Sequence, residues 1–400
     1  MKWSWSVRSL AASRRILSLL VVVWGLQAGL ARAQAPGGPT PDGFDLNVGM
    51  GMRLTNNPGL ASDGGSREGD SITDLRADVT GRRRSPRTEW SSRYTPFYTR
   101  YGSNSQFDTV NHALNLDARY VVSPRSRLGL LERFYSSRDL SQVDTGETAG
   151  EAVILTRLTR RWRNFADAAF DASLSRSLSL QLGASSRIER FDLSPSVDSN
   201  MDSGRLGIRK QIGREDAFST TYSYSRFGFQ GAGVDGAESQ GMDLSWSHGI
   251  PTRTDWTLSA GVSKVSRASE RENRITASAS LHHPFRRMDF VSGYRRGLGA
   301  DSGVANVTVA QDAHAGISAR IGQRASMTVR GEYGSRNSVL ESGDRIALTY
   351  TGGALLGTVT LNPHLNIVAE ARRRSQDVTS VTGDDLTVNT FFLRLELRVF

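Results

Sequence analysis

The side chains best suited to proton transfer at neutral pH are the histidines, because an imidazole changes its charge near that pH. The sequence contains six of them: His112, His248, His282, His283, His314 and His364. None stands in an H-E-x-x-H frame, and the chain has no G-x-S-x-G, P-loop or dinucleotide-binding fingerprint. Asp312 and His314 share one face of a predicted strand and are the best-placed pair, but a single Asp-x-His spacing is common. The sequence therefore predicts no enzyme, no metal site and no cofactor.

Charged side chains instead recur at alternate positions of segments whose other positions are apolar. Such alternation places charges on one face of a β-strand and apolar residues on the other. If the apolar face meets lipid, the charged face lines an interior. The residues that would then line it are Arg93, Asn115, Asp117, Arg119, Arg133, Asp167, Asp171, Arg187, Glu189, Arg209, Arg274, Asp289, Arg295, Arg330, Glu332, Asn366, Glu370, Arg372, Arg394, Glu396 and Arg398.

This lining could conduct or could be purely structural. Charges of both signs, with many Ser and Thr between them, suit a hydrated channel, and an excess of Arg at the narrowest point would favour anions. The alternative is that the same residues only hydrate the interior and stiffen the wall.

The elements that carry these faces are predicted to be about eighteen strands (16–18) over residues 44–400. Eight tight connections rich in Pro, Arg and Ser alternate with nine longer ones rich in Gly, Asp and Ser. The sixth strand is placed at about 162–174, and residues 152–161 could extend it or belong to the preceding loop. Aromatic residues such as Trp90, Trp246 and Trp256 fall near predicted strand ends on the lipid-facing phase, where interfacial girdles form.

A strict short and long alternation predicts an all-β, single, up-and-down antiparallel transmembrane β-barrel with short periplasmic turns and longer extracellular loops. Lipid offers no partner to an unpaired N–H or C=O group, so a spanning sheet must close. The competing class is a secreted β-sandwich or propeller. A propeller would group its strands in fours without alternating its connections in this way.

The last sixteen residues, 385–400, alternate apolar and charged positions and end on an aromatic residue. They resemble the closing strand of a bacterial outer-membrane β-barrel. In that family a terminal Phe helps the assembly machinery to recognise its substrate, which implies that Phe400 is an assembly signal. The residues in phase with Phe400 are Arg398 and Glu396, whereas the family pattern has apolar residues there.

Residues 44–400 as a whole resemble porin-like outer-membrane β-barrels of Gram-negative bacteria. The segments R-R-S-P-R-T-E-W (83–90) and Y-T-P-F-Y-T-R-Y (94–101) also resemble a poorly characterised porin group of similar length, some of whose members are associated with exopolysaccharide export. The resemblance implies an outer-membrane location, outer-membrane lipid and lipopolysaccharide as surroundings, and the barrel assembly machinery as a partner.

The amino terminus predicts export. A positive segment with Lys2 and Arg8 precedes an apolar run at 16–30, and Ala31-Arg32-Ala33 supplies a cleavage site. We expect residues 1–33 to be a signal peptide and 34–43 a short periplasmic lead-in. Removing the five basic residues of that signal from the chain's 50 leaves 45 against 40 acidic residues, so the formal charge falls from +10 to +5. The large positive charge was the main argument for a nucleic-acid partner, and most of that argument is lost with the signal peptide.

The chain has no Cys, which excludes disulfides and thiolate metal sites.

Three functions remain open at this stage. The first is a porin-like channel for small hydrophilic solutes. The second is the barrel component of an exopolysaccharide export system, engaged by periplasmic export components. The third is a non-conducting structural barrel.

Overall fold

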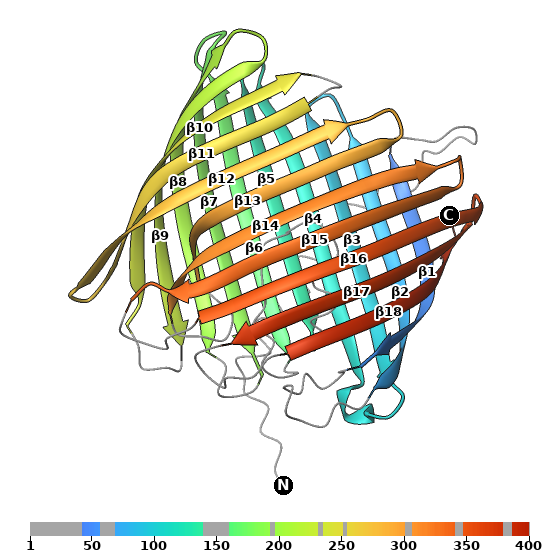
Figure 1. The fold of residues 1–400 in the computed structure, drawn as a ribbon. Helices are drawn as coiled ribbons and strands as arrows, with labels where there is room; N and C mark the ends of the chain where they lie inside the picture. Colours follow the sequence, from blue (N-terminus) through green and yellow to red (C-terminus); the bar gives the residue numbers. More distant parts are fainter. Residues whose placement is uncertain are drawn as a thin grey trace, which may run out of the picture. The chain divides into compact units, whose positions relative to one another are not determined.

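A computed structural model of the chain describes residues 42–56, 69–138, 160–192, 197–230, 235–250, 254–300, 306–340, 347–378 and 386–399. Within them lie eighteen strands and one short 3₁₀ helix, η1 (Ser105–Phe107) (Figure 1). The strands are β1 (Gly43–Thr55), β2 (Asp70–Arg84), β3 (Thr88–Tyr101), β4 (Thr109–Ser123), β5 (Ser126–Ser137), β6 (Arg161–Ser173), β7 (Leu178–Phe191), β8 (Asp198–Ile212), β9 (Asp216–Gln230), β10 (Ala237–Ile250), β11 (Thr254–Arg267), β12 (Glu270–Pro284), β13 (Met288–Ala300), β14 (Val307–Ile321), β15 (Ala325–Ser338), β16 (Ala347–Asn362), β17 (Leu365–Val378) and β18 (Leu386–Arg398).

The strands form one closed sheet. Each pairs antiparallel with its neighbours in sequence, and β1 closes the ring by pairing with β18 from Asn47↔Arg398 to Thr55↔Thr390. The predicted all-β, up-and-down barrel is confirmed. Strands of 12 to 16 residues exceed the 9–11 or so that a tilted strand needs to cross a bilayer.

The connections differ between the two ends of the barrel. At one end, here called the turn end, eight connections of two to four residues join β2 to β3, β4 to β5 and so on to β16 and β17. Gly213 and Gly322 lie in two of these turns with φ of 88° and 71°, a conformation that glycine adopts without steric cost. The other end, the loop end, carries the remaining nine connections.

One expectation about the loop end is wrong. The connection between β11 and β12 was predicted to be one of the longer loops, but it consists only of Ala268 and Ser269. Ala268 has φ of 48°, which a two-residue hairpin turn of the kind that matches strand twist requires. The segment contains no Gly or Asn, so its sequence gave no sign of a tight turn. Residues 152–159 and Phe400 lie outside the described residues.

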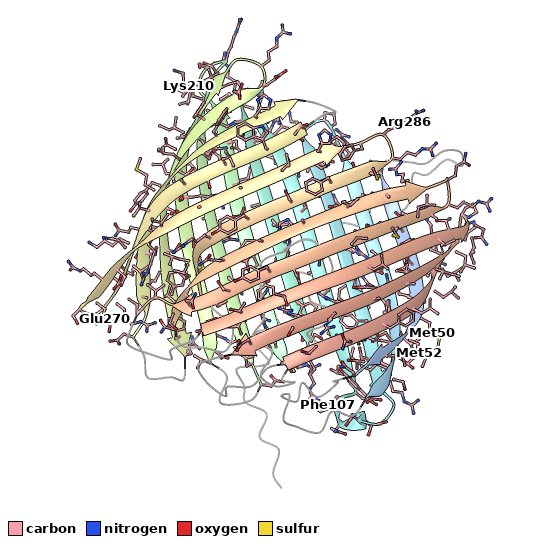
Figure 2. All side chains as sticks on the ribbon, in the orientation of Figure 1. Met50, Met52, Phe107, Lys210, Glu270 and Arg286 are labelled. Atoms are coloured by element: carbon pink, nitrogen blue, oxygen red, sulfur yellow. The ribbon has the colours of Figure 1, made fainter. Side chains whose placement is uncertain are left out.

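The alternation of side chains along each strand gives the barrel an apolar outer face. Met50, Met52 and Leu54 on β1 are about half exposed, and so are Leu393 and Leu395 on the neighbouring β18. Met50 and Met52 project outward from the wall (Figure 2). Half-exposed aliphatic side chains around a closed sheet are stable only where hydrocarbon covers them, so the barrel is a transmembrane one. Among the described residues no helix is long and apolar enough to cross a membrane.

Aromatic side chains gather on the outer face near the turn end. Phe218 on β9 stacks on Trp246 of β10 at 5.7 Å, and Trp246 meets Trp256 of β11 edge to face at 4.4 Å. The indole N–H of Trp246 donates to Asp216 at 3.0 Å. A ring that is apolar on its body and hydrogen-bonded at its tip is suited to the membrane–water interface.

The sheet opens locally at the loop end. β12 and β13 pair only from Ala277↔Arg296 to Pro284↔Asp289, so residues 270–276 of β12 have no partner on β13. The β11–β12 hairpin projects outward, with Glu270 at its tip (Figure 2). β13 instead remains paired with β14 as far as Ala300↔Val307. Its loop end contacts β8, which is not its neighbour in the sheet.

Apolar residues fill this contact, and we call them the apolar seam. Phe227 and Val265 are almost fully buried, which on a wall with a hydrated interior requires an opposing surface. Leu298 of β13 and Met201 of β8 pack against the buried set. The buried members of the seam are Val197, Phe227, Phe229, Ala237, Val265, Val307, Val309, Val339 and Leu340. The seam narrows the loop end of the barrel on the side of β8 to β15.

We expect the free energy of unfolding to respond differently to the same substitution on the two faces of β10. Leu244 lies at mid-strand on the outer face, so Leu244→Arg should lower the free energy of unfolding by about 2–4 kcal/mol in lipid vesicles. Ser245→Arg, one residue further and inward, is the matched control and should change it by less than about 1 kcal/mol. Urea titration in vesicles measures both. Equal losses would show that the faces are wrongly assigned.

Candidate functional site: the polar interior of the barrel

The interior face consists of the residues that alternate with the exposed apolar ones. Along β9 to β12 it is lined by hydroxyl pairs that bridge adjacent strands. Ser219 and Ser245 lie 2.6 Å apart, and Ser259 and Ser278 lie 2.7 Å apart. Each hydroxyl can both donate and accept, so these pairs satisfy one another while leaving capacity for water.

Two carboxylates organise the interior between β1 and β4. Asp74 on β2 pairs with Arg53 of β1 at 3.3 Å and accepts a hydrogen bond from the Thr99 hydroxyl at 2.8 Å. Arg53 and Asp74 are both buried. Asp78, four residues along the same face, is held by Arg76 at 2.8 Å and Arg93 at 3.0 Å. Charge-assisted bonds to these carboxylates fix the strands against one another.

Among the described residues, three arginines surround one acid in the interior between β6 and β7. Glu189 is fully buried and contacts Arg161, Arg163 at 2.7 Å and Arg187 at 3.6 Å. Arg161 is buried as well. These charge-assisted contacts tie β6 to β7.

A third cluster spans β14 to β17. Asp312 accepts from Arg336 at 2.7 Å and from the Tyr350 hydroxyl at 2.9 Å. The guanidinium of Arg374 lies over the Tyr350 ring at 4.9 Å, a cation–π geometry. Since Asp312 is committed to these partners, its role is structural. Among the described residues no hydrogen bond joins Asp312 to His314.

The residues predicted to line the interior all lie on strands, at positions that alternate with the outward apolar ones. They are Arg93 on β3, Asn115, Asp117 and Arg119 on β4, Arg133 on β5, Asp167 and Asp171 on β6, Arg187 and Glu189 on β7, Arg209 on β8, Arg274 on β12, Asp289 and Arg295 on β13, Arg330 and Glu332 on β15, Asn366, Glu370 and Arg372 on β17, and Arg394, Glu396 and Arg398 on β18.

The structure brings several of these residues into ion pairs and leaves others without one. Arg372 lies 3.8 Å from Glu332, and Arg394 lies 2.6 Å from Glu396. Further pairs that involve predicted residues are Asp117–Arg119, Arg205–Asp167, Arg274–Glu272, His282–Asp289 and Arg398–Asp45.

Three predicted arginines have no carboxylate within ion-pair distance among the described residues: Arg209, Arg295 and Arg330. Arg209 donates to the Ser247 hydroxyl at 3.4 Å. Arg295 is exposed within the interior, because its cross-strand neighbour Asp312 is bonded elsewhere.

Several residues of the clusters are absent from the predicted lining, namely Arg53, Asp74, Asp78, Arg161 and Arg336. Alternation with apolar neighbours marks Arg53, Asp74 and Asp78 as inward-facing. Arg336 stands between Ser335 and Asn337, so no such alternation marks it.

No group of three or more His, Asp or Glu side chains in the part of the chain that the structure describes could hold a metal ion.

Comparison with protein-family models found no match. Comparison with curated proteins likewise found none. Solved structures that resemble the barrel include three from Pseudomonas aeruginosa. OccK2 (OpdF) is 12% identical, with a TM-score of 0.47, over 89% of this chain and 98% of that chain. OpdO is 10% identical, with a TM-score of 0.48, over 89% and 98%. The outer membrane protein opdK is 10% identical, with a TM-score of 0.45, over 89% and 99%.

Removing the charge of Glu189 should destabilise the barrel, because a neutral amide would replace a buried carboxylate that three arginines contact. We expect Glu189→Gln to lower the free energy of unfolding by about 3–5 kcal/mol. The control is Glu238→Gln on the exposed outer face of β10, which should change it by no more than about 0.5 kcal/mol. Urea titration in lipid vesicles measures both. A neutral result for Glu189→Gln would mean that water or counter-ions balance the arginines.

Proposed function

We propose that the protein is a porin-like channel in the outer membrane of a Gram-negative bacterium, and that it passes small hydrophilic solutes. The observation that carries the proposal is a closed transmembrane sheet whose inner face bears Arg, Asp, Glu, Ser and Thr. Eighteen strands enclose a lumen wider than side chains from the wall can fill. A polar lumen of that width gives hydrophilic solutes a path that the surrounding hydrocarbon denies them.

The unpaired arginines give the channel its selectivity. Arg209, Arg295 and Arg330 present positive charge to the interior, and none of the three has a carboxylate within ion-pair distance among the described residues. Basic side chains that line a pore lower the barrier for anions and raise it for cations. The channel therefore prefers anionic or electronegative small solutes. The proposal includes no catalytic role.

Orientation and targeting complete the proposal. Both ends of the barrel's chain, the start of β1 and the end of β18, lie at the turn end, and in an outer-membrane barrel that end faces the periplasm. Residues 1–33 would direct export and be removed after Ala33, and the assembly machinery would then insert the barrel with Phe400 as its signal. The export-duct and structural alternatives have no structural observation in their favour.

The channel proposal is tested by single-channel recording in planar bilayers, with protein produced in the outer membrane of a Gram-negative host and extracted in detergent. We expect stable conductance steps and a reversal potential that indicates anion preference across a KCl gradient. Heat-modifiable gel mobility on the same sample reports whether the barrel is folded. A folded barrel without conductance would contradict the proposal.

A matched pair of substitutions on β8 tests the interior arginines. Arg209→Glu should reduce the anion preference, because it reverses a charge that faces the lumen. Lys210→Glu makes the same change one residue away on the outer face, at the turn end (Figure 2), and should leave selectivity unchanged. The reversal potential measures both. Equal shifts would show that charge at the rim, not inside, sets selectivity.

A further inference from the structure

The outer face of the barrel carries a shallow apolar groove that neither the fold nor the channel requires. It crosses the outer surface from β15 through β16, β17 and β18 to β1, and its volume is about 850 Å³. Its lining includes Leu54, Val329, Gly353, Leu355, Ala371 and Phe391. The four large apolar side chains among them stand about half exposed and form its walls.

The groove lining includes the small residues Gly353 and Ala371, and Gly331 lies beside Gly353. Gly331 on β15 and Gly353 on β16 are direct cross-strand partners on the outer face, and Ala371 of β17 lies opposite Leu355 in the next row. Glycine and alanine have no side-chain atoms beyond Cβ, so this row forms a depression between the flanking aliphatic and aromatic side chains.

Internal packing does not explain the two outward glycines. A Cβ at Gly353 would find its nearest neighbour, the carbonyl oxygen of Arg330, at 3.8 Å, and one at Gly331 would meet only the Gly352 oxygen at 4.0 Å. Gly352, which faces inward, is different, because a Cβ there would lie 2.6 Å from Glu332 Oε1. The interior therefore leaves no room for a side chain at Gly352. At Gly331 and Gly353 there is room, and the absence of side chains leaves the outer surface recessed.

A cationic group stands at the edge of the groove where the apolar belt ends. Towards the loop end, the outward positions of β17 change from Ala371 to Arg373 and then to Ser375. Arg373 is exposed, and its direct partners are Gly353 on one side and Asn389 on the other. Within the described residues Arg373 has no ion pair. Its guanidinium can extend over Gly353 without meeting a side chain.

We propose that this groove binds a membrane lipid with an anionic phosphate headgroup, one acyl chain lying over Gly331 and Gly353 and the phosphate meeting Arg373 and Asn389. A guanidinium fork matches two phosphate oxygens, and the Asn389 amide can donate a further hydrogen bond. The apolar walls supply the contact that an acyl chain needs. Arg373 lies at the edge of the apolar belt and has no ion pair within the described residues, so a phosphate headgroup would supply the missing negative charge. A second copy of the barrel could occupy the groove only if it placed an acidic side chain at that point. The inference rests on the proposed membrane location but not on conduction.

The test is native mass spectrometry of the full protein, extracted in detergent and supplied with phosphatidylglycerol or with phosphatidylcholine of the same acyl chains. We expect the barrel to retain the anionic lipid in preference to the zwitterionic one. Arg373→Gln should reduce retention of phosphatidylglycerol about fivefold, because one basic group at the surface is removed. Gly353→Leu should reduce retention of both lipids, because it fills the groove.

Two control substitutions make the same changes elsewhere on the outer face. Lys264→Gln removes an exposed cation from β11, and Gly204→Leu adds a side chain on β8, where a Cβ meets nothing within 4 Å. Neither should alter retention, and heat-modifiable mobility should show that all four variants are folded.

Three results would overturn the inference. Retention that is equal for both lipids and indifferent to Arg373→Gln would mean ordinary surrounding lipid. Displacement of the bound species by millimolar inorganic phosphate alone would mean a phosphate site without an acyl chain. Loss of an oligomer in Gly353→Leu, with lipid retention unchanged, would mean that the groove is a contact between copies. Conductance recorded on the same variants keeps this outcome separate from failure of the channel proposal.

Discussion

The structure depends on one constraint, which is that hydrocarbon offers no hydrogen-bond partner to a backbone N–H or C=O group. Closure of β1 onto β18 leaves the sheet without a free edge strand. Within the described strands, residues 270–276 of β12 separate from the end of β13, and this opening lies at the loop end. Side chains there, such as Glu270 and Arg271, are charged, which places the unpaired edge in water and not in lipid.

Closure turns strand alternation into two chemically distinct surfaces. Inward positions are free to carry charge, and the protein uses buried acids with more than one basic or hydroxyl partner to hold strands in register. Asp78 contacts two arginines and Glu189 contacts three. Arginines left over from these pairings, such as Arg295, give the interior its positive character. The apolar seam is the exception, since it requires β13 to reach β8 across the barrel.

The outer surface is not uniform either. Most outward positions carry aliphatic groups, while aromatic rings mark the turn end and a row of small residues lowers the surface on β15 to β17. Gly353 and Gly352 are adjacent in sequence yet serve different needs. One faces lipid and the other accommodates Glu332 in the interior. The structural role of a glycine in this wall therefore depends on the face on which it lies.

The sequence by itself determined the number of strands, their alternation and the closed barrel class. These follow from the alternation of apolar and polar side chains every two residues, which can be read from the sequence alone. Only the tertiary structure decided that Glu189 meets three arginines, that Asp312 is committed to Arg336 and Tyr350, and that β11 and β12 meet in two residues. It alone placed Arg373 beside Gly353. Such partners lie on different strands, and register between strands depends on pairings over long sequence distances that a local pattern does not contain.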